Sequence, residues 1–203
     1  MSVFRNLLTQ LFDKGGLPKE YQRVEWIAGT STTMKYNAID TGIKMQPNIE
    51  ITIGASWNQS FNASYDRLAG LDKLGWMEAS SNSSAICLYP TGMGSYSNAM
   101  STTRSEVKIT TTYWSMDGTT IKTYTAPTFG NTNIILDSNT TGQYTYGGRF
   151  SIWDCMIKVS DNIVFNAVPC YRKSDGVIGM YDFVSQTFIT SSGAGTFIKG
   201  GDI

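Results

Sequence analysis

The chain has 203 residues, of which sixteen are Lys or Arg and sixteen are Asp or Glu, so its formal net charge is zero. Without a broad positive field, nucleic acid is not an expected partner. No apolar run reaches the roughly 20 residues needed to cross a bilayer, so we expect no membrane span. Only 16% of residues are charged, 12% are aromatic, and Ser, Thr, Asn and Gly are abundant. This composition favours one mostly β domain with many turns.

The first sixteen residues have a helical period. Apolar side chains recur there at three- and four-residue steps, at Val3, Phe4, Leu7, Leu8, Leu11 and Phe12. Gly15 and Gly16 end the pattern, and Pro18 prevents its resumption. Polar residues interrupt the stripe and no cleavage site follows, which argues against a signal peptide. We therefore expect residues 1–16 to form an amphipathic helix and a Gly joint. The stripe either folds back on its own domain or serves as an anchor on a partner, and we predict the anchor.

From residue 17 to 203 the pattern is of short strands between turns, which predicts one domain of two packed antiparallel sheets. The expected strands lie near 21–27, 33–40, 48–57, 74–78, 84–89, 105–114, 119–125, 133–137, 149–159, 162–168, 177–182, 186–190 and 196–199.

Two hairpins follow from turn signals. Asp117-Gly118 favours a two-residue turn with positive φ at both positions. Counting outward from this turn, Tyr113 faces Lys122, and the core side is expected to carry Val107, Ile109, Tyr113 and Tyr124. Trp114 and Ile121 then lie opposite each other on the solvated face. The second hairpin joins 149–159 to 162–168 through residues 160–162.

The cysteine count is odd, with Cys87, Cys155 and Cys170, so at least one is free or pairs between chains. The second hairpin would set Cys155 opposite about position 167 rather than 170, which makes a disulfide across it improbable. No basic activator lies near these cysteines in the sequence, so buried structural thiols are expected.

The segments "LPKEYQRVEWI", "YNAIDTGIK", "GRFSIWDCMIKVSDNIVFNAVPCYRKSDGVIGMYD" and "TFITSSGAGTF" occur in this order. In this order they resemble the concanavalin A-like, laminin-G-like jelly-roll domains of phage structural proteins and of gut-bacterial surface proteins. The resemblance spans roughly residues 17–200 and implies a two-sheet antiparallel jelly-roll sandwich. Because its motifs are strand and turn signatures, it carries over no site residues.

Catalysis is not expected. The chain has no histidine, which removes Ser-His-Asp and Cys-His chemistry and most zinc sites. A glycosidase needs two carboxyl groups about 5 to 10 Å apart. Glucanases of this fold commonly carry a Glu-x-Asp-x-x-Glu pattern, which is missing. Glu25, Glu50, Glu78 and Glu106 instead stand one to each expected strand.

No cofactor or metal is predicted. Loop oxygens of Asp66, Asp72, Asp137 and Asn139 leave calcium open, since the fold often binds it. Their spacing matches no dedicated calcium loop, and turn formation explains them equally well.

Glycan binding requires exposed aromatic faces with amide and hydroxyl groups beside them. Aromatic residues near the expected loops supply candidates at Trp57, Tyr65, Trp76, Tyr96 and Trp114. Core packing is the competing explanation for each. The segment from Tyr89 to Arg104 is the best candidate for a binding loop, because of its length and Gly/Ser content.

Together these features predict a non-catalytic phage virion surface protein, made in the host cytoplasm, with a lectin-like domain for host or mucosal glycans. A head fibre, a decoration protein and a tail adhesin remain open. Its N-terminal stripe would attach to other virion proteins, and a homo-oligomer is expected, for example a trimer. The alternative is a bacterial surface polysaccharide-binding module or glycoside hydrolase.

Overall fold

The structure is a computed structural model that describes residues 16–30, 37–58, 67–71, 75–79, 85–89, 96–125, 128–136, 150–193 and 195–203. Within these ranges the regular elements are β-strands in two antiparallel sheets, which confirms the expected all-β class. The amphipathic helix expected at residues 1–16 lies outside the described residues, apart from Gly16. No helix in the described ranges is long and apolar enough to span a bilayer.

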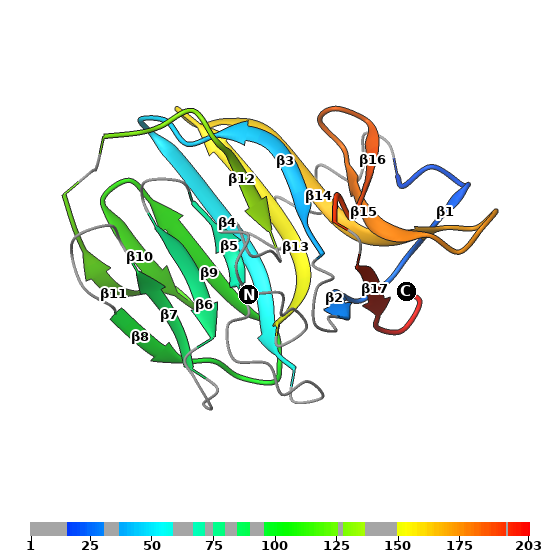
Figure 1. Cartoon of the computed structure of the whole chain (residues 1–203), viewed down its shortest axis with the longest axis horizontal. Helices are drawn as coiled ribbons and strands as arrows, with labels where there is room; N and C mark the ends of the chain where they lie inside the picture. The colour runs from blue at the N-terminus through cyan, green and yellow to red at the C-terminus, as the bar shows by residue number, and fades with distance from the viewer. Residues whose placement is uncertain are drawn as a thin grey trace.

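The larger sheet has eleven strands and runs through the whole molecule (Figure 1). Its main path is β11 (Thr119–Thr123), β10 (Tyr113–Met116), β9 (Ser105–Thr110), β4 (Ile49–Trp57), β13 (Phe150–Val159), β14 (Asn162–Arg172), β15 (Ile178–Asp182) and β16 (Thr187–Thr190). Three strands join from the side: β1 (Tyr21–Arg23), β2 (Ile27–Thr30) and β17 (Thr196–Lys199).

The smaller sheet has six strands. Its order is β3 (Ile39–Lys44), β12 (Asn133–Leu136), β5 (Arg67–Gly70), β6 (Trp76–Ala79), β7 (Ala85–Tyr89) and β8 (Tyr96–Ala99). Two of these strands, β5 and β8, were not expected from the sequence. β8 lies within the segment 89–104 that was predicted as a binding loop, so that segment is partly an edge strand.

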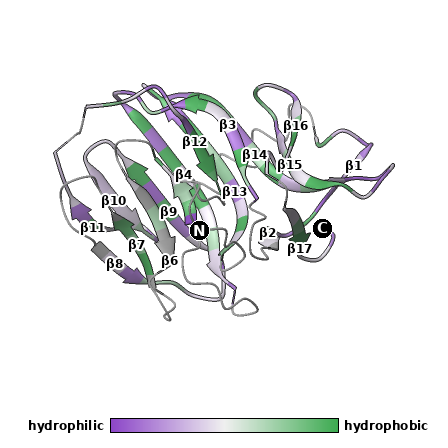
Figure 2. Cartoon of the chain, viewed as in Figure 1, coloured by the Kyte–Doolittle hydropathy of each residue, from purple (hydrophilic) through white to green (hydrophobic). Residues whose placement is uncertain are grey.

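One hydrophobic core joins the two sheets. Ile51 and Ile53 of β4 belong to the same buried cluster as Ile86 and Leu88 of β7. Strand β9 shows the period of two that this packing requires, with alternate residues buried from Ser105 to Ile109. Figure 2 shows the contrast between a core strand and an edge strand: β7 is coloured as hydrophobic and β11 as hydrophilic. The architecture is therefore a β-sandwich.

The hairpin at Asp117-Gly118 forms as predicted, with φ of 48° and 79°, but its faces differ from the prediction. Residues 105–114 are not one strand, because the chain turns between β9 and β10 and pairs Trp114 with Ile109. Paired residues share a face, so Trp114 joins the core and is fully buried. A register shift in the β10–β11 pairing also sets Tyr113 opposite Thr123 rather than Lys122. Ile121 packs against the core as well.

The second hairpin and the cysteines agree with prediction. β13 and β14 are joined by Ser160 and Asp161, whose φ values are 46° and 67°. Cys155 pairs with Ala167, so no disulfide crosses this hairpin. All three cysteines are free and buried. Burial raises the pKa of Cys155 well above its usual value and that of Cys170 to about 12.

The last eight residues pair with the first strands of the domain. β17 runs antiparallel to β2 from Thr196 opposite Thr30 to Lys199 opposite Ile27. The pairing continues as a bridge between Val24 and Asp202. Trp26 lies against Gly200, where an added Cβ would come 2.7 Å from the indole Nε1. The C-terminal segment thus completes the sheet next to the start of the domain.

Candidate functional site

The predicted glycan-binding aromatics do not form one described surface. Trp114 is buried in the core, which overturns its assignment as a binding residue. Trp57 is half-buried at the end of β4 and packs edge-on against Phe150, with ring centroids 6.1 Å apart. Tyr65 lies outside the described residues, as do the side chains of Trp76 and Tyr96.

A cleft opens instead at the other end of β4. It has a volume of about 470 Å³ and is bounded by three turns of the larger sheet. Figure 1 shows the end of the sheet where β4 begins and β13 ends. Its lining consists of Asn48, Ile49, Glu50, Thr110, Thr111, Thr112, Tyr113, Lys158, Ser160 and Asp161. Trp57 is eight residues beyond Ile49 along β4, which is roughly 26 Å at about 3.3 Å per residue. It therefore belongs to a different part of the surface.

One wall of the cleft is the loop between β9 and β10, and it is held by its own hydrogen bonds. The Thr110 hydroxyl accepts the backbone N–H groups of Thr112 and Tyr113 at 3.2 and 3.0 Å. The Tyr124 hydroxyl lies 2.8 Å from the carbonyl oxygen of Thr110 and 3.0 Å from that of Tyr113. Burial, with a smaller effect of Tyr113, raises the pKa of Tyr124, so its hydroxyl remains a donor.

The opposite wall consists of two turns that are bonded to each other. The N–H of Ser160 donates to the carbonyl oxygen of Asn48 at 3.0 Å. Asn48, Ser160 and Asp161 all have positive φ, between 46° and 67°. Asn, Asp and Ser tolerate such turns better than most residues do, because their short polar side chains bond locally. Both walls are therefore shaped before any ligand arrives.

Ion pairs form beside the cleft. Glu50 lies opposite Lys158 in the β4–β13 register, and Lys108 stands on the neighbouring strand β9. The Glu50 Oε1 is 3.4 Å from the Nζ of Lys108 and 3.8 Å from that of Lys158. Glu50 is thus already engaged by two ammonium groups. Asp161 carries the second carboxyl group of the lining, and it is exposed on the turn between β13 and β14.

The chemistry of the cleft is that of a polar, hydroxyl-rich recess. Three consecutive threonines, a serine and an asparagine offer hydrogen-bond donors and acceptors, and Tyr113 adds an aromatic ring. Such groups match the hydroxyl groups of a sugar. No group of three His, Cys, Asp or Glu side chains in the described ranges could hold a metal ion. The calcium candidates Asp66, Asp72, Asp137 and Asn139 lie outside those ranges.

A second polar cluster is part of the sheet rather than a recess. Arg104 donates to Asp154 twice, from Nε and Nη2, each at 3.0 Å. The guanidinium lies over Gly54, where an added Cβ would come 2.5 Å from Nε. Asp154 also accepts the N–H of Gly54 at 3.2 Å. The geometry explains why glycine stands in the middle of β4: only hydrogen leaves room for the ion pair.

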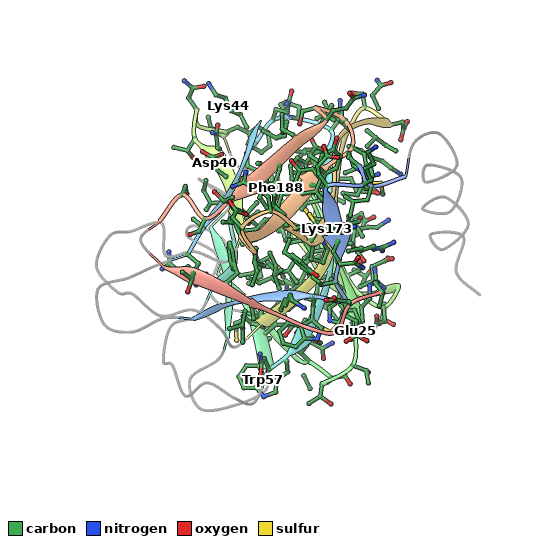
Figure 3. The ribbon with its side chains drawn as sticks, turned by 90° about the vertical axis from the view of Figure 1, so that its right-hand side faces the viewer. Glu25, Asp40, Lys44, Trp57, Lys173 and Phe188 are labelled. Carbon is green, nitrogen blue, oxygen red and sulfur yellow. The ribbon has the colours of Figure 1, made fainter. Side chains whose placement is uncertain are left out.

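An aromatic patch occupies the other half of the larger sheet and consists of Tyr21, Tyr181, Phe183 and Phe188. The ring of Tyr21 lies 5.3 Å from that of Tyr181 and 4.9 Å from that of Phe188. The rings of Tyr181 and Phe183 meet edge-on at 5.4 Å. Figure 3 shows Phe188 and Lys173 on the face turned to the viewer, with Trp57 at the lower end.

Sequence reasoning missed both the cleft and the patch. Residues 110–112 were expected to be part of one strand over 105–114, although three hydroxyl residues before an aromatic also suit a turn. Tyr21 and Phe188 are 167 positions apart and meet only through the pairing of β1, β14, β15 and β16. No local signal in the sequence could reveal that contact.

No protein-family model matches the chain, and no curated protein matches it.

Proposed function

We propose that this protein is a non-catalytic, lectin-like protein that binds a glycan chain in the cleft between the β9–β10 loop and the turns at Asn48 and Ser160. The observation that carries the proposal is the lining of that cleft: hydroxyl and amide groups held by fixed turns, beside one tyrosine ring. A pre-shaped polar recess loses little freedom on binding, which favours affinity for a flexible saccharide.

The wider setting of the proposal comes from the sequence resemblance. We propose a concanavalin A-like jelly roll displayed on a phage particle, as a head fibre, decoration protein or tail adhesin. Attachment would use the apolar stripe Val3, Phe4, Leu7, Leu8, Leu11 and Phe12. These residues lie outside the described ranges, so this part is supported by the sequence pattern alone. Electron microscopy of labelled particles tests it, and absence from the particle surface would contradict it.

Turnover is not part of the proposal, although the cleft lining includes two carboxyl groups. A retaining or inverting glycosidase needs one carboxyl group that can donate a proton. Glu50 is shared between Lys108 and Lys158, an environment that suits an ion-pair partner. Release of reducing ends from a bound polysaccharide, lost in Glu50→Gln, would instead establish the hydrolase alternative.

Binding is tested by titrating the full chain with the polysaccharides that a glycan array selects. Tyr113→Ala should weaken binding about tenfold or more, which corresponds to about 1.4 kcal/mol or more. Thr112→Ala should weaken it several-fold. Thr120→Ala is the matched control, because Thr120 is also exposed but stands on β11 outside the cleft. Equal affinity of all three variants, or no glycan bound by the unaltered chain, would refute binding at this cleft.

A further inference from the structure

Three charged side chains meet on the outer face of the larger sheet, beside the cleft: Glu50 of β4, Lys108 of β9 and Lys158 of β13. Each stands between two residues that pack with the core, so all three point away from it. Glu50 and Lys158 also line the cleft. These three residues are called the charged cluster below.

The charged cluster has two ammonium groups for one carboxylate. Both approach the same oxygen, Oε1 of Glu50, at 3.4 Å from Lys108 and 3.8 Å from Lys158. Charge-assisted hydrogen bonds between such groups are about 2.7 to 2.9 Å long. Within the described ranges, neither ammonium group has another acceptor. Both lysines therefore keep N–H donors that the protein itself does not use.

The ion pair of Arg104 and Asp154 on the same sheet shows how a closer contact is made. Arg104 donates to both oxygens of Asp154, each at 3.0 Å. In the charged cluster only one oxygen of Glu50 takes part, and the other has no partner among the residues that the structure describes. The charged cluster is thus a looser arrangement, with room for a further acceptor.

A buried hydroxyl group lies on the same face. Thr52 is two residues beyond Glu50 on β4, and it stands opposite Lys108 in the β4–β9 register. Thr52 is 1% exposed, and its Oγ1 has no hydrogen-bond partner in the described structure. Buried hydroxyl groups normally have such a partner. The polar groups of this face are therefore not all satisfied by the protein alone.

Asp161 also lines the cleft, but it does not cancel the positive charge of the charged cluster. It is exposed on its turn, where water and salt screen its charge. The side chains of the charged cluster are only 24 to 29% exposed, so their charges are screened less. An anionic group that enters the cleft would meet a local excess of positive charge at Lys108 and Lys158.

We propose that the cleft selects acidic saccharides and places a carboxylate or sulfate group of the sugar against Lys108 and Lys158. This inference rests on the proposed function, since it names the class of glycan bound at the same cleft. The anion gives both ammonium groups a further acceptor and reduces the repulsion between them. The hydroxyl groups of the same saccharide contact the polar lining.

The class of ligand is tested with the full chain on an array of neutral, uronic acid, sialic acid and sulfated oligosaccharides. We expect the bound glycans to be acidic. Each is then titrated beside its carboxyl-methylated or desulfated form, and loss of the anionic group should weaken binding about tenfold. The two treatments distinguish a carboxylate ligand from a sulfate ligand. The difference in affinity should shrink as the salt concentration rises, because salt screens the ion pairs.

Substitutions locate the effect. Lys108→Gln and Lys158→Gln should each weaken binding of the acidic glycan several-fold and leave binding of its neutral form unchanged. Glu50→Gln should do the opposite and strengthen binding of the acidic glycan, because it removes the carboxylate that competes for both ammonium groups. Lys44→Gln is the matched control: it removes the same charge, but Lys44 stands exposed on β3 of the smaller sheet and bonds to Asn131. Circular dichroism checks that each variant is folded.

The outcomes separate this proposal from the proposed function. Binding of neutral glycans alone, weakened by Tyr113→Ala, would overturn the acidic class and leave glycan binding at the cleft intact. Equal loss of affinity in Lys158→Gln and Lys44→Gln would indicate a general effect of net charge and would also overturn it. Weaker binding in Glu50→Gln would mean that the charged cluster is a structural ion pair. Binding of no glycan at all would be a failure of the proposed function itself.

Discussion

Trp114 is the largest of the fully buried side chains in the described core. It stands on β10 next to Ile109 of β9 and belongs to the cluster that joins the two sheets. A side chain of this size contributes through both its transfer from water and the space it fills. Its role is structural, and a substitution there acts on folding before it can act on any ligand.

Trp114→Ala should therefore lower the free energy of unfolding by about 3 to 5 kcal/mol, the usual range for a large aromatic residue deleted from a core. The measurement is urea denaturation followed by circular dichroism. Trp57→Ala serves as comparison, because Trp57 is half-buried and should cost less. A loss below about 1 kcal/mol for Trp114→Ala would show that the core tolerates the cavity, contrary to the packing described.

At the scale of a single turn, Asp182 organises the connection from β15 to β16. The residue is 2% exposed. It accepts backbone N–H groups from Asn166, Val184 and Ser185 at 2.8, 3.1 and 3.0 Å. The Ser185 hydroxyl donates to it as well, at 2.6 Å. This carboxylate ties β14 to the turn that carries Val184 and thereby shapes one edge of the aromatic patch.

Asp182→Ala should destabilise the protein by about 2 to 4 kcal/mol, because several donors would lose their acceptor in a buried setting. Thermal and urea unfolding measure the effect. Asp175→Ala is the control, since Asp175 forms an exposed ion pair with Arg172 and should change stability little. Equal stability of the two variants would contradict the organising role of Asp182.

Most of the strands could be predicted from the sequence, because alternation and turn residues are local signals. The hairpin from β13 to β14 illustrates this, with the pairing of Cys155 and Ala167 following from the turn alone. The predictions are wrong where a turn that was not recognised shifts the alternation of core-facing and solvent-facing residues along a strand. An unrecognised turn at Thr111 and Thr112 moved Trp114 to the wrong face. The cleft and the aromatic patch depend on contacts between distant strands, which local patterns do not encode.

At the scale of the whole molecule, the two ends of the chain are expected to contribute differently to the stability of the fold. Residues 196–203 pair with residues 23–30 along one continuous stretch, and Phe197 contributes to the core. Residues 1–16 are instead predicted from the sequence pattern to form a separate anchor. The two ends therefore have opposite expected tolerance to truncation.

Deleting residues 196–203 should abolish cooperative unfolding, because β2 loses its pairing with β17 and the core loses Phe197. Deleting residues 1–16 should leave a folded domain that no longer forms oligomers or joins particles. Circular dichroism melts and light scattering distinguish the two. Aggregation or a much earlier melt after the N-terminal deletion would mean that the stripe belongs to the domain's own core, and the anchor would be wrong.

The pairing of residues 24–30 with residues 196–202 also affects how the protein folds during synthesis. Nearly the whole chain separates the partners, which makes this a contact of very high sequence separation, formed late and at a large cost in loop entropy. While the ribosome is still translating the last strand, β2 has no β17 to pair with and its edge is open to other chains. Slow translation of residues 196–202 would therefore leave this edge open for longer and favour aggregation.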